Sequence, residues 1–488
     1  MVFSILPANT ESAAYEIENS LRFNDGDNPK LAFTPSSAVV AERKTFTISC
    51  WVKRGIISTV QYLWEMGGND NADDRFFARF DASDKLKISD SGTIYRETNR
   101  LFRDSSAWYH IVVAVDTTDG TADNRVKVYV NGVQETSFAT SNNPGQNDQK
   151  GFSDDSEHTI GRTGIDNGFS FDGYMADFNA VGGSQLAPTS FGETNDNGVW
   201  IPKNYTGSHG TNGFFLEFKE TGTSQNSSGM GADTSGNDNH FAVTNLAATD
   251  ITTDTPTNNF AVFRAHGFPQ NSKNVLSEGN TDFDFTGDGG NSARRLDNHC
   301  ISNIGVVNGK WYAEFKHTED ADGGFIGVSN MSNKIQTAEI ESYAYIYTND
   351  SQLYFRPKTG ASESNTNHGG SSNSLNDIYQ VALDMDNNNV YFGKNGSWAS
   401  GSGAWNQSNP TSARSLSSDF INTDSHGLVV FNCAGAGSST TPRFQANFGN
   451  APFSISSGNA DANGYGNFEY AVPSGYYSLC TKNLAEYG

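Results

Sequence analysis

Cysteine is scarce in this chain of 488 residues, which contains four cysteines, and no two of them form a CxxC pair. They are Cys50, Cys300, Cys433 and Cys480. Their spacing excludes metal and redox motifs built on paired cysteines, and their low density argues against a disulfide framework. Cys50 lies in TFTISCWVK, where alternate residues are apolar, so we expect it to be a buried free thiol.

Basic residues are also few. The chain has 32 Lys and Arg against 55 Asp and Glu, a formal net charge of −23, and no local cluster of Lys and Arg offsets it. The resulting negative field repels the phosphates of nucleic acids and the anionic surfaces of membranes. The composition therefore predicts no nucleic-acid partner, and it is compatible with the binding of cations.

Long apolar runs are missing as well. No stretch approaches the roughly 18 apolar residues that a membrane-spanning helix needs, so we expect no membrane span. The opening stretch, MVFSILPANTESAAYEIENS, lacks a basic region and a long apolar core. We therefore expect no standard signal peptide.

What the sequence does contain is typical of β-structure. Residues 20–190 consist of short segments such as FTISCWVKR, WYHIVVAVD and HTIGR, separated by Gly, Asn, Asp or Pro. The same pattern resumes at residue 281 with GKWYAEFKH, YAYIYTND and IYQVALDMD. No segment longer than a few turns has the 3.6-residue apolar period of a helix. The sequence therefore predicts an all-β protein built from antiparallel β-sandwiches of the jelly-roll type.

Length and composition divide the chain into two domains. A chain of 488 residues exceeds the roughly 250–300 residues at which a single core stops growing. Residues 223–280 are rich in Gly, Ser, Asn and Thr and have little periodicity, which is typical of a linker. We therefore expect one sandwich at 1–222, a linker at 223–280 and a second sandwich at 281–488.

The same hairpin is predicted in both halves. RVKVYVNGVQE and VYFGKNGSW place Asn131-Gly132 and Asn395-Gly396 between alternating strands. Asn-Gly favours a type I′ turn, in which both central residues need positive φ. We expect a tight turn at each corner, as part of the fold and not as a binding site.

These segments carry a resemblance to known families. The first half resembles laminin-G-like, concanavalin A-like jelly rolls through FTISCWVKR, WYHIVVAVD, KVYVNGV, HTIGR and FDGYMADFNAV. The second half resembles SPRY-like sandwiches through GKWYAEFKH, GFIGVS, YQVALDMDNNNVYFGKNG and FQANFGNAPF. Joining segments such as DTSGNDNHFAVTN, and the ending PSGYYSLCTKNL, resemble virion proteins of tailed, notably marine, bacteriophages. The resemblance covers nearly the whole chain and implies a tail fibre, adhesin or capsid decoration.

Concanavalin A-like folds also include glycoside hydrolases, whose chemistry needs paired carboxylates. The hydrolase motif resembles ExDxxE on one strand. The nearest segment here is AEIESYAYIY, in which Glu339 and Glu341 share a face but tyrosine replaces the third carboxylate. No GxSxG elbow is present, and the histidines lack zinc-ligand spacing. We expect no enzymatic activity, with a glycoside hydrolase or depolymerase as the alternative.

Acidic loops in the first half offer the oxygen ligands that Ca²⁺ prefers. Laminin-G-like domains often hold one Ca²⁺ at a rim of the sandwich, so the resemblance implies such an ion here. The candidate ligands in GGNDNADDR and DTTDGTADN are Asp70, Asp73, Asp74, Asp116, Asp119 and Asp123. They do not follow EF-hand order, so solvated turn residues are the alternative. No motif requires a cofactor, and Ca²⁺ is the only ion that these loops suggest.

Glycan binding would use an exposed aromatic ring beside Asp or Asn side chains. Trp64, with Asp70 in the loop that follows it, is one candidate. Trp398 and Trp405, on either side of a Gly/Ser loop, are the others. The alternative is that these tryptophans close the open ends of a sandwich.

Together these features predict a non-enzymatic virion protein, assembled in the host cytoplasm and exposed on the exterior of the particle. The expected partners are other virion proteins and a glycan or receptor on the host surface. We expect a homo-oligomer, because many weakly binding copies raise the avidity for a surface. A purely structural virion component without a receptor is a further alternative.

Overall fold

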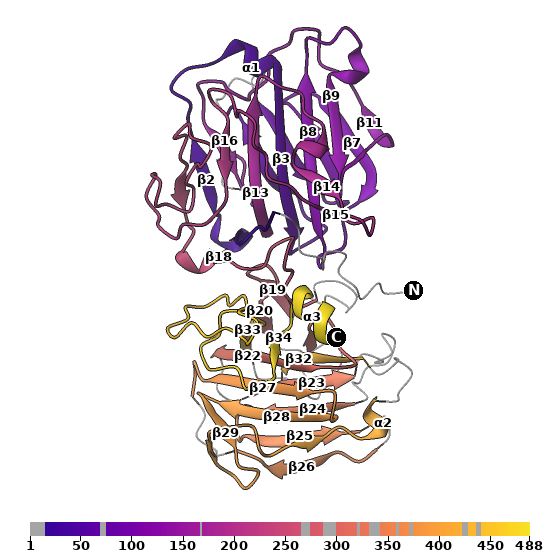
Figure 1. Cartoon of the computed structure of the whole chain (residues 1–488), viewed down its shortest axis with the longest axis vertical. Coiled ribbons are helices and arrows are strands. Elements are labelled where there is room, and N and C mark those ends of the chain that lie inside the picture. Colours follow the sequence, from indigo (N-terminus) through magenta and orange to yellow (C-terminus); the bar gives the residue numbers. More distant parts are fainter. Residues whose placement is uncertain are drawn as a thin grey trace. The chain divides into compact units, whose positions relative to one another are not determined.

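The structure is a computed structural model that describes residues 15–68, 75–165, 168–264, 274–285, 299–319, 323–330, 342–357, 361–369, 374–421, 428–435 and 441–488. These residues form two compact units (Figure 1). Residues 15–258 with 277–279 make the first unit, and residues 259–276 and 280–488 make the second. Each unit is built from antiparallel sheets, so the predicted all-β fold is confirmed.

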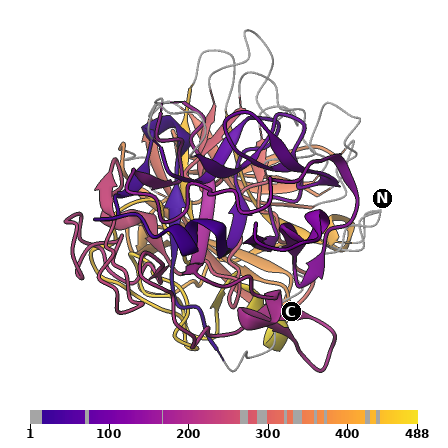
Figure 2. The ribbon, with the colours of Figure 1, turned by 90° about the horizontal axis from the view of Figure 1, so that it is seen from above.

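The first unit has two large sheets. One contains, in hydrogen-bonded order, β10 (Val133–Gln134), β9 (Val126–Val130), β8 (Trp108–Asp116), β3 (Thr45–Arg54), β13 (Gly173–Gly182), β1 (Ser20–Phe23) and β18 (Ile251–Thr252), with β16 (Phe214–Leu216) on β13. The other contains β11 (Phe138–Ser141), β7 (Ile94–Leu101), β6 (Lys85–Ser89), β5 (Phe76–Phe80), β4 (Gln61–Met66), β12 (His158–Ile160), β2 (Lys30–Phe33) and β17 (Ala242–Thr244). Figure 2 looks roughly along these strands onto the loops near α1 (Val40–Lys44).

The core of the first unit lies between the two sheets. Alternate residues of β3 and β8, such as Ile48 and Val113, pack with Phe76 and Ile88 of the other sheet. Cys50 lies in the same core as a free thiol, as its position in the strand predicted. Period-2 alternation decides these positions, because successive side chains of a strand point to opposite faces.

The outer face of the sheet that contains β3 is covered by the chain itself. Residues 186–205, which include the hairpin of β14 (Gly192–Thr194) and β15 (Trp200–Pro202), pack on this face. Trp200 donates a hydrogen bond from Nε1 to Nδ1 of His110 at 3.0 Å, and His110 stacks on Trp51 with ring centroids 4.7 Å apart. This face therefore offers no open platform at β3 and β8.

The described residues of the predicted linker, 223–280, do not form a linker but belong to the two compact units. Residues 223–258 belong to the first unit, in which β17 pairs with β2 and Phe241 is fully buried in the core. Residues 259–264 belong to the second unit, in which Phe263 is buried. A Gly- and Asn-rich composition also suits a packed chain of tight turns, and a few long-range contacts of its apolar residues are enough to order it.

The second unit also has two sheets. One contains β19 (Asn274–Ser277), β20 (Asp282–Phe285), β33 (Arg443–Asn447), β22 (Lys310–Glu319), β27 (Ile378–Asp384), β28 (Asn389–Lys394), β29 (Ser397–Ala399) and β30 (Trp405–Gln407), with β31 (Arg414–Ser415) on β28 and β34 (Tyr477–Ser478) on β22. The other contains β21 (His299–Ile301), β32 (Val429–Gly435), β23 (Gly324–Asn330), β24 (Tyr343–Tyr347), β25 (Gln352–Arg356) and β26 (Ser364–Asn367). Trp311, Phe315 and Phe431 are fully buried in its core. Two short helices, α2 (Ser418–Ile421) and α3 (Thr481–Tyr487), complete the described part of this unit.

Both predicted hairpins are confirmed. Val130 pairs with Val133 and Lys394 pairs with Ser397, which leaves Asn131-Gly132 and Asn395-Gly396 as two-residue turns. The φ angles are 48° and 78° in the first turn and 49° and 81° in the second, as a type I′ turn requires.

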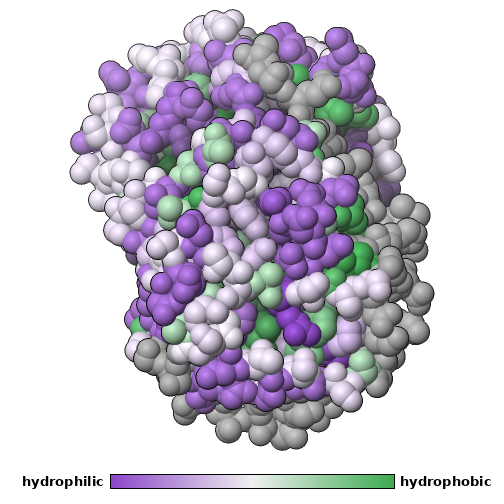
Figure 3. Space-filling model, turned by 60° about the horizontal axis from the view of Figure 1, so that its bottom comes forward, coloured by the Kyte–Doolittle hydropathy of each residue, from purple (hydrophilic) through white to green (hydrophobic). Residues whose placement is uncertain are grey.

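On the face drawn in Figure 3, polar residues dominate and the hydrophobic areas are small and separate. Among the described residues, Phe169 is the most exposed Phe, Tyr or Trp, at 49%. Within the described ranges, no helix is long and apolar enough to cross a membrane.

Candidate functional site

Two of the three candidate tryptophans are buried, so the prediction that they form exposed sugar platforms was wrong for them. Trp64 has 0% exposure and packs in the core of the first unit, 5.8 Å from the ring of Phe76. Trp398 has 3% exposure and packs with Tyr312. Whether a ring is buried depends on the face of the sheet to which its side chain points, and not on whether its residue lies beside a loop. Trp405 is partly exposed, so its role in glycan binding stays a prediction.

The predicted calcium ligands do not converge where they can be placed. Asp70, Asp73 and Asp74 lie outside the described residues. Asp116 accepts a hydrogen bond from the N–H of Thr118, and Asp119 accepts one from the N–H of Thr121. Asp123 accepts one from the Nδ2 of Asn143. Among the residues that the structure describes, no group of three His, Cys, Asp or Glu side chains could hold a metal ion. Asp116 and Asp119 instead cap turns, and Asp123 holds a side chain 20 residues later in the chain.

The carboxylates considered for hydrolysis, Glu339 and Glu341, also lie outside the described residues. Several other carboxyls have a raised pKa, and those of Asp177 and Glu314 reach the range that suits a general acid. Burial raises the pKa of Asp177 to about 7, although a hydrogen bond from Tyr15 opposes the shift. Burial also raises the pKa of Glu314 to about 7. Their exposed fractions are 3% and 0%, so neither carboxyl is accessible to a glycosidic oxygen.

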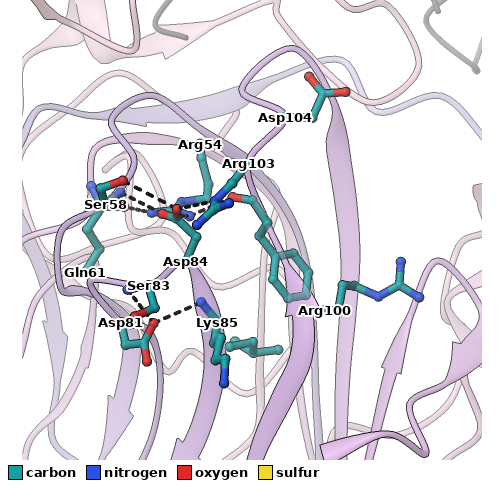
Figure 4. A network of polar contacts seen from close by, with 12 residues as sticks. Arg54, Ser58, Gln61, Asp81, Ser83, Asp84, Lys85, Arg100, Arg103 and Asp104 are labelled. Carbon is teal, nitrogen blue, oxygen red and sulfur yellow. Dashed lines mark hydrogen bonds and ion pairs between the residues drawn. The ribbon is translucent and has the colours of Figure 1, made fainter. Parts of the chain in front are cut away.

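A buried polar network holds the turn between β5 and β6 (Figure 4). Asp84, which has a φ of 66°, accepts hydrogen bonds from Ser58 N at 2.6 Å, Arg54 Nη1 at 3.1 Å and Arg103 Nε at 2.9 Å. Burial raises the pKa of this carboxyl, but the donors outweigh it and hold the pKa below its usual range. Because the side chains of Arg54 and Asp84 are fully buried, the network is structural and fixes the position of the hairpin.

A second sheet face combines aromatic rings with amide groups. On β24, Ala344 and Ile346 point into the core of the second unit, while the three tyrosines of YAYIY point to the opposite face. Tyr354 of β25 lies on that same face, because Leu353 and Phe355 are the core residues of that strand. The alternation of large aromatic and small or aliphatic residues therefore directs the tyrosines outward.

Three rings form one surface at this face. Phe325 of β23 lies directly opposite Tyr347, and their ring centroids are 4.8 Å apart. Tyr354 meets Phe325 edge-on at 5.5 Å and Tyr347 edge-on at 6.0 Å. Phe325 is 3% exposed, whereas Tyr347 and Tyr354 are partly exposed. We call Phe325, Tyr347 and Tyr354 the tyrosine face.

Amide side chains border the tyrosine face. Asn365 of β26 lies directly opposite Tyr354 and is exposed. It donates a hydrogen bond from Nδ2 to Oε1 of Gln352 at 3.0 Å, which places both amides on this face. Aromatic rings next to Asn and Gln amides can stack on the apolar side of a sugar and hydrogen-bond its hydroxyls.

The sequence interpretation did not select these residues. It noted the tyrosines of AEIESYAYIY only as a replacement for a third carboxylate, and it sought platforms only among tryptophans near loops. The signal that could have found the face is the alternation in YAYIYTNDSQLYFR, where tyrosines alternate with aliphatic residues on two successive strands.

Comparison with known proteins supports the fold of the first unit. Residues 25–184 match the laminin G family model described as the concanavalin A-like lectin/glucanases superfamily. This match and the two packed sheets confirm the predicted concanavalin A-like jelly roll for the first unit. Among curated proteins, no sequence matches the chain.

Several solved structures resemble parts of the chain. A Bacteroides ovatus protein proposed to bind carbohydrate is 16% identical, with a TM-score of 0.34, over 48% of this chain and 59% of its own, less than two thirds of its length. The SPRY domain of human HERC1 is 14% identical, with a TM-score of 0.25, over 36% of this chain and 91% of its own. Domains LG4-5 of the mouse laminin α1 chain are 10% identical, with a TM-score of 0.28, over 97% of this chain and 90% of their own.

Proposed function

We propose that this chain is a non-enzymatic glycan-binding protein on the exterior of a tailed-bacteriophage virion, as a tail fibre, an adhesin or a capsid decoration. The observation that carries glycan binding is the tyrosine face, with partly exposed Tyr347 and Tyr354 beside the amides of Gln352 and Asn365. The concanavalin A-like lectin match of residues 25–184 supports the same class of ligand. The virion setting rests on the resemblance of the joining and C-terminal segments to phage proteins.

Recognition would act through stacking and amide hydrogen bonds. The rings of Tyr347 and Tyr354 meet at 90°, so a pyranose that stacks on one ring touches the other at its edge. The amides of Gln352 and Asn365 can exchange their mutual hydrogen bond for bonds to sugar hydroxyls. Such a site is shallow and its single-copy affinity is low, so multivalent display on a particle would supply the avidity.

The proposal includes a setting for the protein. It is assembled in the host cytoplasm with other virion proteins, forms a homo-oligomer, and requires no cofactor, while a bound Ca²⁺ in the first unit would be an accessory. Neither nucleic acid nor a membrane is a partner, in line with the net charge of −23. Its role on the particle is attachment to a glycan or receptor on the host surface.

The glycan site is tested on the purified full chain with an array of neutral bacterial surface glycans. The expected result is that Tyr354→Ala and Tyr347→Ala each weaken binding of the selected glycan about tenfold, since loss of one stacked ring costs about 1–2 kcal/mol. Tyr391→Ala is the matched control, because Tyr391 is a partly exposed tyrosine on a different sheet of the same unit. Binding that survives both tyrosine substitutions would remove the tyrosine face from the proposal.

The setting and the alternatives have their own measurements. Purified protein should block adsorption of the phage to its host, and labelled antibody should decorate the outside of intact particles. Reducing sugar released from host polysaccharide would favour a depolymerase instead. Decoration of the particle without any glycan binding or block of adsorption would favour a purely structural virion component.

A further inference from the structure

The outer face of β5 in the first unit carries a cation beside two aromatic rings. Phe76, Ala78 and Phe80 of this strand point into the core, so Phe77 and Arg79 point outward. Tyr62 of β4 and Lys87 of β6 lie directly opposite Arg79 on the two neighbouring strands. The Asp84 network anchors the turn at the end of the same hairpin (Figure 4).

Among the described residues, Arg79 lacks the ion pair with a carboxylate that the neighbouring cations form. Lys87 forms ion pairs with Asp81 at 3.0 Å and Glu97 at 3.8 Å. Arg75 pairs with Glu65. Among the described residues no carboxylate pairs with Arg79, although the chain has 55 acidic side chains against 32 basic ones. An arginine left without a carboxylate in so acidic a protein has its guanidinium available for an anion from outside.

The chain holds this guanidinium in a defined orientation. Its centre lies 5.4 Å from the ring centroid of Tyr62 and 5.6 Å from that of Phe77. Nη1 donates a hydrogen bond to the Oη of Tyr62 at 3.1 Å, and the buried Nε has no hydrogen-bond partner. These contacts fix the plane of the guanidinium, so little side-chain entropy remains to be lost when an anion binds. Its Nη2 makes no hydrogen bond within the described chain.

An exposed aromatic ring lies beside the same face. Phe169 is 49% exposed, and its ring centroid is 6.1 Å from that of Tyr62. Its backbone has a φ of 61°, which is strained for a bulky side chain. The N–H of Tyr62 donates to the carbonyl of Phe169 at 2.9 Å, which holds this conformation. Residues with strained backbone conformations cluster at ligand-binding and active sites.

We propose that Arg79 and Phe169 form a second binding site, for a saccharide that carries a carboxylate, such as a hexuronic acid residue. The planar guanidinium matches a carboxylate through paired N–H donors, and the ring of Phe169 takes the apolar face of the sugar. The site belongs to the first unit, and it differs from the tyrosine face in both position and ligand chemistry. It does not depend on the function proposed for that face.

The test uses the full chain and oligosaccharides of galacturonic acid, with titration calorimetry as the readout. The wild-type protein should bind the acidic oligomer, and the methyl-esterified oligomer should bind at least tenfold more weakly, because esterification removes the anion and leaves the ring unchanged. Added salt should weaken binding of the acid and not of the ester. Equal binding of the two oligomers would overturn the proposal without any variant.

Substitutions then assign the site. Arg79→Gln should weaken binding of the acidic oligomer about ten- to hundredfold, the scale of a charged hydrogen-bonded pair. Arg79→Lys, which keeps the charge and loses the fork, should fall between Gln and wild type. The matched control is Lys203→Gln, because Lys203 is a half-exposed cation on the separate hairpin of β14 and β15. Unchanged affinity of Arg79→Gln for the acidic oligomer would overturn the proposal. If inorganic sulfate competes for the site as strongly as acetate does, the site would be assigned to anions in general.

The two binding sites can fail separately. Tyr354→Ala should leave the binding of the acidic oligomer unchanged, and Arg79→Gln should leave the binding of the neutral glycan unchanged. Loss of both ligands in either variant, with an unchanged melting temperature, would contradict two independent sites.

Discussion

The Nζ atom of Lys53 lies 2.7 Å from Oδ2 of Asp254, and neither side chain is exposed. Asp254 also accepts a hydrogen bond from Nε1 of Trp108 at 3.3 Å. Burial lowers the pKa of Lys53, and the charge of Asp254 opposes that shift. This pair joins strand β3 to a segment some two hundred residues later in the chain.

Removing one partner of this pair should destabilise the first unit strongly. Asp254→Ala leaves a buried ammonium without a counter-charge, which costs about 3–5 kcal/mol. Urea unfolding checks this value. The control is Glu193→Ala, because the Glu193–Lys203 pair is about half exposed at 3.8 Å and should contribute no more than about 1 kcal/mol. A similar loss in both variants would show that burial of the pair does not matter.

Asp84 should make the stability of the first unit depend on acid. Its pKa is depressed in the folded state, so its contribution is present above the unfolded value of 3.8 and is lost as pH falls through the folded pKa. Asp84→Asn should lower the free energy of unfolding by about 3–5 kcal/mol at pH 7, because Arg54 stays buried without a charge partner. The difference from wild type should shrink as the pH falls below 3.8 and through the folded-state pKa.

Urea unfolding at pH 7 and pH 2.5 measures this difference. Asp238→Asn is the control, because that carboxylate is 89% exposed and its loss should change stability little at either pH. A difference between wild type and Asp84→Asn that stays constant with pH would contradict the assignment of the acid dependence to Asp84.

Glu314 should give the second unit the opposite pH dependence of stability, a loss as the pH rises. Its pKa is raised from 4.5 to about 7, so the folded state holds the proton more tightly and this advantage is lost as pH rises from 4.5 through 7. Glu314→Gln cannot ionise, and its single carbonyl oxygen can still accept from one of the two N–H groups, those of Glu469 and Tyr470, which bond to separate oxygens of the carboxyl. The fall in melting temperature from pH 5 to pH 8 should therefore be smaller in this variant than in wild type.

The control for this comparison is Glu486→Gln, which changes an exposed carboxylate of the same unit. Its melting temperature should follow the wild-type pH dependence. If Glu314→Gln also follows the wild-type curve, Glu314 is ionised in the folded protein across this range and the burial argument fails.

The two tryptophans on either side of the Gly/Ser loop should contribute differently to folding free energy, because they differ in burial. Trp398→Ala removes a ring that is 3% exposed and packed with Tyr312, so it should cost about 3–5 kcal/mol of folding free energy. Trp405 is partly exposed, and its substitution should cost clearly less. Guanidinium unfolding followed by circular dichroism compares them. Equal costs would mean that the loop residues pack differently from the structure.

Much of the local structure follows from the sequence because its causes are local. Asn-Gly tolerates positive φ at two successive residues, so both type I′ corners can be predicted without any tertiary information. Alternation in TFTISCWVK places Cys50 with the other core residues of β3 for the same reason. The acidic balance and the short alternating strands likewise predict an all-β fold with no nucleic-acid partner.

The candidate sites depend on contacts between distant strands, which alternation alone does not specify. A strand such as FFARF has aromatic residues on both faces, and only pairing with β4 and β6 shows that Phe77 and Arg79 lie outside. Trp64 and Trp398 lie beside turns in sequence, yet the sheets bury both rings. Local propensity is the same for a buried and an exposed ring, so the sequence by itself cannot separate these cases.

The sequence by itself therefore determined the all-β class, the hairpin corners and the charge of the surface, since each depends on neighbours a few residues apart. Only the tertiary structure decided that residues 223–258 pack into the first unit, that Arg79 has no carboxylate partner among the described residues, and that Tyr347 and Tyr354 share one face. The physical reason is that burial and charge pairing are set by strand register across the sheets, which joins residues far apart in the chain.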